Sequence, residues 1–273
     1  MPVTFPRYQM PRRILFGLLR DWVFLRPRSF HEDARACIQT LGPQLQIEGA
    51  EHIPAEGPRV VTFNHYCRPG FGVWWLAMAV SATLPPQQHM TMTGELTRWY
   101  PPFGGPLSRF ALPRLARVYG FTPMPPMPPR PQDVEARARA VRRVLEYIEK
   151  TEKPLVVIAP EGRDNLNGGV LDWPPQGAGR FLALMAARGL SLVPVGGWDE
   201  AGALRLRFGA SYRLQVPKSL SPDEKDRFAA QTVMQAIAAL LPERLRGEFG
   251  LNRDVIASER SAASDPCTAR KGR

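Results

Sequence analysis

The feature that most constrains the fold is the alternation of helix-period segments with short, continuously apolar ones. In the segment 134–148 the apolar residues recur at steps of four and three, which places them on one face of a helix, and the opposite face carries four arginines. The stretch 155–159 follows as an unbroken apolar run, typical of a central strand in a parallel sheet. A surface helix leading into a buried strand indicates an α/β arrangement.

Segments of both kinds recur along the chain. We expect further strands at 45–48, 59–63, 192–195 and 204–208. We expect helices at about 72–81 and 177–187, and a helix from Ser221 to about Leu241 that begins with a capping box. The proline-dense stretch 123–131 is predicted to be a loop. The sequence therefore predicts one α/β domain whose largely parallel central sheet is flanked by helices.

Charge and cysteine content narrow the classes of function. The formal net charge of +11 and the pI of about 10.2 favour binding to polyanions. No helix-turn-helix, zinc-finger or RNP-type pattern accompanies this charge, so we expect no nucleic-acid partner and favour anionic lipid headgroups. The three cysteines have no metal-ligand or disulfide-framework spacing, which predicts no metal site and a reducing, cytoplasmic setting.

The first 44 residues form a basic amphipathic segment. Large apolar residues between positions 14 and 25 alternate with arginines, and no signal-peptide cleavage pattern is present. We expect this segment to hold the protein peripherally on a membrane, with a helix simply packed on the domain as the alternative. The longest apolar stretch, 71–84, is too short to span a bilayer. We therefore divide the chain into a membrane-associating segment 1–44, an α/β domain 45–257 and a disordered tail 258–273.

Chemically useful residues follow two of the predicted strands. Asn64 and His65 come directly after 59–63, and the tetrapeptide Pro160-Glu161-Gly162-Arg163 follows 155–159. Because ligand sites of such sheets lie beyond the carboxyl ends of the strands, both groups can face one crevice. His65 suits a general base, although a structural histidine is the alternative. Arg68 suits an anion clamp.

In the tetrapeptide, Gly162 allows backbone amides to approach a ligand and Arg163 offers a fork to phosphate. The alternative is an ordinary turn with a solvated arginine.

The order of these blocks resembles the glycerolipid acyltransferase family, also called lysophospholipid or PlsC-type acyltransferases. The blocks that carry the resemblance are Asn64-His65-Tyr66-Cys67-Arg68-Pro69-Gly70, Gly94-Glu95-Leu96 with Pro102-Phe103-Gly104, Pro160-Glu161-Gly162-Arg163, and Val193-Pro194-Val195. The resemblance covers about residues 45–215. It implies a glycerolphosphate acyltransferase-like fold.

The resemblance also implies acyl transfer from acyl-CoA or acyl-carrier protein to a hydroxyl of a lysophospholipid or glycerolphosphate-like acceptor. His65 would be the base, while Asn64, Arg68, Glu161, Gly162 and Arg163 would bind substrate. No bound cofactor or metal is implied, and the setting would be the cytoplasmic face of a membrane.

Two departures from the family pattern bear on activity. The family places an aspartate at the position of Gly70, and its third block has a threonine before the arginine, which is absent here. Glu95, Glu161 and Asp164 are candidate replacements for the aspartate. The alternative function is a family member that binds lipid or acyl carrier without turnover.

Overall fold

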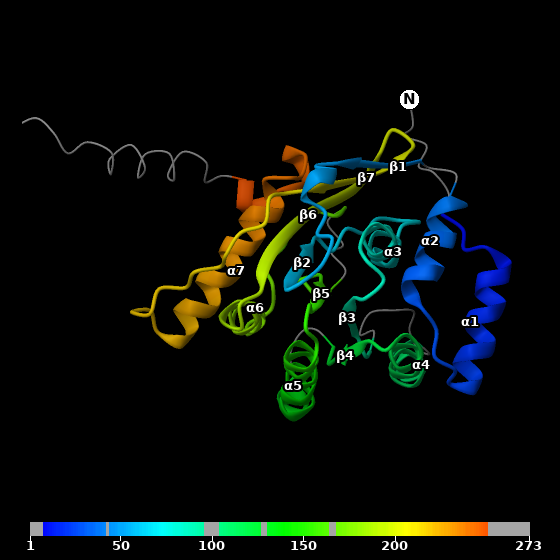
Figure 1. Ribbon diagram of the computed structural model, residues 1–273, viewed down its shortest axis with the longest axis horizontal. Helices are drawn as coiled ribbons and strands as arrows, with labels where there is room; N and C mark the ends of the chain where they lie inside the picture. Colours follow the sequence, from blue (N-terminus) through cyan, green and yellow to red (C-terminus); the bar gives the residue numbers. More distant parts are fainter. Residues whose placement is uncertain (1–7, 42–43, 96–103, 127–129, 164–167, 251–273) are drawn as a thin grey trace, which may run out of the picture.

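The computed structural model describes residues 8–41, 44–95, 104–126, 130–163 and 168–250 (Figure 1). The predicted disordered tail lies outside these residues. In the described chain, one mixed sheet has the strand order β1-β7-β6-β2-β5-β3-β4. The strands are β1 (Gln44–Glu48), β2 (Arg59–Phe63), β3 (His89–Thr93), β4 (Thr122–Met124), β5 (Leu155–Ile158), β6 (Ser191–Glu200) and β7 (Ala203–Phe208).

The direction of the strands sets where the site can lie. β6, β2, β5, β3 and β4 run parallel, whereas β7 pairs antiparallel with β6, and β1 runs parallel to β7. β2 and β5 are adjacent in the sheet, with Arg59 opposite Leu155 and Thr62 opposite Ile158. Their carboxyl ends therefore meet at one edge, and this confirms the predicted α/β class with a mostly parallel sheet.

Helices cover both faces of the sheet. Figure 1 shows α2 (Phe30–Gln39) and α3 (Val73–Thr83) on one side, and α6 (Ala178–Ala187) and α7 (Pro222–Ala238) on the other. α1 (Arg12–Phe24) lies beyond α2, α4 (Gly104–Tyr119) lies beside β4 and contacts α1, and α5 (Val134–Lys150) also lies near β4. None of the helices in the described ranges is long and apolar enough to cross a membrane.

The core follows from the pattern of the strands. Central strands are buried on both faces, and β5 with four buried residues is the clearest case, as its unbroken apolar run predicts. α5 buries Ala140, Val144 and Ile148 and exposes Arg139, Arg142 and Arg143 on the opposite face, while Arg137 is half-buried. The capping box predicted at Ser221 and Glu224 is present at the start of α7.

One expectation for the proline-dense stretch 123–131 was wrong. Pro123 and Met124 belong to β4, and 131–133 form a 3-10 turn before α5. A proline is tolerated in β4 because it is an edge strand, where the missing N–H removes no bond to a second neighbour. β3 has too little periodicity to be predicted, and the glycines at the start of α4 and Pro113 within it argue against a helix there.

Candidate active site

At the end of β2, the Asn64 side chain forms two buried hydrogen bonds with the backbone of Gly197. The Asn64 side chain donates from Nδ2 to the carbonyl of Gly197 at 2.8 Å and accepts from the Gly197 N–H at 2.7 Å. Asn64 is fully buried. This pair of bonds fastens the end of β2 to β6 and fixes the direction in which His65 leaves the sheet. Its predicted role in substrate binding stays a prediction.

Glu161 joins the ends of β2 and β5. Its Oε1 accepts the backbone N–H of His65 at 2.6 Å, and its Oε2 accepts the backbone N–H of Asp172 at 3.0 Å. The residue is 1% exposed. The two blocks that are 96 positions apart in sequence therefore meet at one rim, and Glu161 holds the main chain of the histidine. The ring of His65 is partly exposed at this rim, and its Nδ1 is buried.

Glu161 is also an unusual acid. Burial raises its pKa to about 7, against the opposing effect of the hydrogen bonds from the amides of His65 and Asp172. The cause is that a carboxylate loses hydration in an apolar site, and two amide donors replace only part of it. Its protonation therefore changes near neutral pH.

A second buried carboxylate, Asp199, holds the loop after His65. Both of its oxygens accept the Nε of Arg68 at 3.0 Å, and the two side chains also form an ion pair through Nη2. The hydroxyl of Tyr66 donates to Asp199 at 2.7 Å. The side chains of Arg68 and Asp199 are only 5% and 0% exposed. The guanidinium predicted to clamp an anion is thus engaged by a protein carboxylate.

Sequence reasoning did not find Asp199. It lies 131 positions from Arg68, and we expected its strand to end at Val195. β6 instead continues through two glycines and Trp198 to Glu200, paired with β7 along this whole length. An acidic residue inside a segment of small and apolar residues was the signal available.

Gly162 and Arg163 lie beside the site. Gly162 has φ of 62°, a left-handed conformation that suits glycine, where the chain turns after β5. Arg163 contacts Asp172 at 2.5 Å and its side chain is 44% exposed. Through Asp172 it connects to the backbone that Glu161 holds, and its guanidinium lies at the surface.

The three candidate replacements for the missing aspartate have different positions. Glu161 binds the backbone of His65, as described above. Glu95 forms ion pairs with Arg109 and Arg130 beyond β3. Asp164 lies outside the described residues. Within the described ranges no group of three or more His, Cys, Asp or Glu side chains could hold a metal ion.

Removing the charge of Asp199 tests whether it holds the loop. Asp199→Asn leaves the buried Arg68 guanidinium without its opposing charge, so we expect a loss of about 3 kcal/mol in the free energy of unfolding. Glu200→Gln removes the same charge from the next residue, whose side chain is 40% exposed, and should cost less than about 1 kcal/mol. Urea unfolding of both variants measures the difference, and equal losses would contradict the assignment.

The raised pKa of Glu161 predicts a pH dependence of stability. Since the folded pKa of about 7 exceeds the ordinary value of 4.5, the folded protein holds this proton more tightly than the unfolded chain. Its stabilising contribution is present below about pH 4.5 and is lost as pH rises through about 7. At 1.36 kcal/mol per pKa unit this amounts to about 3 kcal/mol at most. Glu161→Gln should remove this decline between pH 5 and 7 in urea titrations, and an unchanged slope would refute the prediction.

Comparison with known proteins agrees with this geometry. A profile of the acyltransferase family matches residues 44–198. The fold matches the crystal structure of the 1-acyl-sn-glycerophosphate (LPA) acyltransferase PlsC from Thermotoga maritima with a TM-score of 0.51 and 14% identity, over 84% of this chain and 87% of that chain. No curated protein sequence matches significantly. His65, Glu161 and the strands that carry them all fall inside the matched segment, and the chain belongs to the acyltransferase family.

Proposed function

We propose that this protein transfers an acyl group from acyl-CoA or acyl-carrier protein to a hydroxyl of a lysophospholipid or glycerolphosphate-like acceptor. His65 is the general base. The observation that carries the proposal is the hydrogen bond from the His65 backbone to Glu161, which fixes the histidine at the rim where β2 and β5 end. The family membership and the fold shared with PlsC, an acyltransferase for 1-acyl-sn-glycerophosphate, support the reaction class.

The proposed chemistry needs one proton acceptor at a partly exposed position. The imidazole removes the proton from the acceptor hydroxyl as its oxygen attacks the thioester carbonyl. The C–S bond then breaks, and the imidazolium gives the proton to the leaving thiolate. General-base assistance of this kind contributes about 10² to 10⁴ in rate. The exposed Arg163 is suited to the phosphate of donor or acceptor.

Gly70 favours a second candidate function. Where the family has an aspartate, this chain has a glycine with φ of 80°, and no side chain there can orient the imidazole. Without such an orienting carboxylate, the protein would bind lipid or acyl carrier and release them unchanged. Against this, Glu161 holds the backbone of His65 and Asp199 holds Tyr66 and Arg68 just after it, so part of the orienting task is met by the fixed loop.

Substituting the histidine separates the two functions. We expect His65→Ala to lower thioester-dependent acylation of a panel of lysolipids by at least about 10²-fold, since it removes the proton acceptor. His52→Ala is the matched control, because that ring is 37% exposed and lies beside Glu51. The acylated lipid is measured with purified full-length protein. Background rates in wild type and His65→Ala alike would favour the binding function.

We also propose that the protein works peripherally on the cytoplasmic face of a membrane. α1 is partly packed on the domain, because Trp22 contacts Phe110 of α4 and Arg114 donates to the carbonyls of Trp22 and Val23. Even so, large apolar side chains remain exposed on the two helices: Leu15, Phe16, Leu19, Val23 and Phe24 in α1, and Leu107 and Phe110 in α4.

The charge around this apolar surface suits lipid. α1 carries no acidic residue other than Asp21, which is buried and bonded to Arg20 and Arg28. Arginines in and beside a surface of exposed aromatic and aliphatic side chains fit the headgroup layer of an anionic bilayer, where each basic residue adds about 1 kcal/mol of attraction.

Vesicle binding tests this surface. The double variant Phe16→Asp, Phe24→Asp should lose about tenfold or more of its affinity for vesicles containing anionic phospholipid, because both rings are 66% exposed and their burial is lost. Val134→Asp is the control, an apolar residue 67% exposed on α5. Co-sedimentation at low and high salt measures both. Equal losses of vesicle affinity in the two variants would refute membrane docking through α1. Binding that does not depend on lipid charge or salt concentration would refute it as well.

A further inference from the structure

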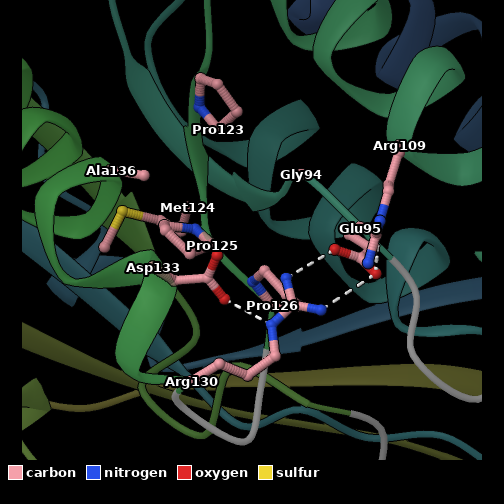
Figure 2. A pocket seen from close by; sticks show the side chains of 10 residues that line it. All are labelled: Gly94, Glu95, Arg109, Pro123, Met124, Pro125, Pro126, Arg130, Asp133 and Ala136. Atoms are coloured by element: carbon pink, nitrogen blue, oxygen red, sulfur yellow. Dashed lines mark hydrogen bonds and ion pairs between the residues drawn. The ribbon is translucent and has the colours of Figure 1, made fainter.

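A pocket opens at the carboxyl ends of β3 and β4. It has a volume of about 190 Å³ (Figure 2). Glu95 follows β3, Arg109 comes from α4, and Arg130 and Asp133 precede α5. Figure 2 shows these four charged side chains converging, with prolines, Met124 and Ala136 forming an apolar wall.

The pocket shares the edge of the sheet that carries His65. In the strand order, β5 lies between β2 and β3, and all of these strands run in one direction. Since neighbouring strands are about 4.8 Å apart, the ends of β2 and β3 lie roughly 10 Å apart across the sheet. A polar headgroup held in the pocket can thus belong to the same molecule whose hydroxyl reaches the histidine.

The charges lining the pocket balance. Arg130 lies between the two carboxylates: its Nη1 and Nη2 donate to Glu95 at 3.3 and 2.8 Å, and its Nε donates to Asp133 at 2.5 Å. Arg109 contacts Glu95 through Nε at 2.8 Å. Burial alone would raise the pKa of Glu95, but the hydrogen bonds from both arginines outweigh it and lower the pKa, so the carboxylate stays ionised.

Arg109 and Asp133, at the two ends of this network, can each bind a ligand group of opposite charge. The Arg109 side chain is 61% exposed, which leaves the far side of its guanidinium accessible for an anionic oxygen. Asp133 lines the pocket and makes its bond to Arg130 through Oδ2, while its Oδ1 is a second acceptor oxygen; Arg137, one turn along α5, also interacts with this carboxylate. One site for a negative group and one for a positive group therefore lie together.

We propose that this pocket receives a zwitterionic acceptor headgroup, a phosphodiester that also carries an ammonium, with the phosphate on Arg109 and the ammonium on Asp133. The proposal rests on the proposed acyl transfer and names the acceptor class for it. A dianionic phosphate monoester fits less well, because it would bring two negative charges toward two carboxylates that already neutralise the arginines. The carbons between phosphate and ammonium would lie along the wall of prolines and Met124.

Direct binding tests the proposal without turnover. Ligand-observed NMR titrations of the wild-type full chain with glycerophosphoethanolamine and with glycerol 3-phosphate compare a zwitterion with a dianion of similar size. We expect the zwitterion to bind more tightly. The proposal would be overturned if glycerol 3-phosphate bound more tightly, or if neither ligand bound.

A charge-neutralising variant assigns the ammonium site. Asp133→Asn should weaken the binding of glycerophosphoethanolamine about tenfold. The affinity for glycerol 3-phosphate should stay unchanged or increase. The variant is expected to fold, since the Asp133 side chain makes no capping bond to α5. Glu135→Gln is the control, because it changes the net charge equally two residues away at a side chain that is 81% exposed. Equal effects of the two variants would overturn the assignment.

The acylation assay separates this proposal from the proposed function. An active wild type that prefers lysophosphatidylethanolamine over lysophosphatidic acid, with the preference lost in Asp133→Asn and kept in Glu135→Gln, supports both. An active wild type whose acceptor preference is the same in Asp133→Asn overturns the headgroup assignment alone. An inactive wild type that still binds the zwitterion through Asp133 overturns acyl transfer alone.

Discussion

The site depends on one buried carboxylate that accepts hydrogen bonds from two backbone amides. Glu161 ties the main chain of His65 to that of Asp172, and so links the loops that follow two neighbouring strands. A charged side chain would be costly in this surrounding, but two amide donors compensate part of the lost hydration. The result is a side chain whose task is to hold the backbone, so that residues distant in sequence keep a fixed relation at one rim.

Asp199 holds the residues that follow the histidine. It accepts from Tyr66 and Arg68, and both of these lie in the segment between His65 and Gly70. The loop is therefore held at its first residue by Glu161 and further along by Asp199. In the acyl transfer that we propose, this bracing of the loop backbone supplies part of the orientation that the family aspartate would give.

Local patterns were enough to predict most of the fold. The unbroken apolar run of β5, the β-branched residues of β2 and the periodicity of α5 each report a burial pattern within a few residues. β4 was mispredicted because proline argues against a strand, and only the sheet order shows that β4 is an edge. The meeting of His65 with Glu161 was predictable, since parallel strands end at one edge. The partner of Arg68 was not predicted, because we expected the strand to end at Val195, which left Asp199 outside the sheet.

The position of Asp199 depends on the hairpin formed by β6 and β7. The two strands pair from Val195 opposite Phe208 to Glu200 opposite Ala203, and the turn uses Ala201 and Gly202, both with positive φ. Such a two-residue turn fixes the register of a hairpin. Pairing with β7 extends β6 beyond the end of its parallel neighbour β2. The extension places the buried carboxylate of Asp199 against the loop that follows His65. Slipping that register by one residue would turn Asp199 to the opposite face of the sheet and release Arg68, so a remote turn governs local order around the imidazole.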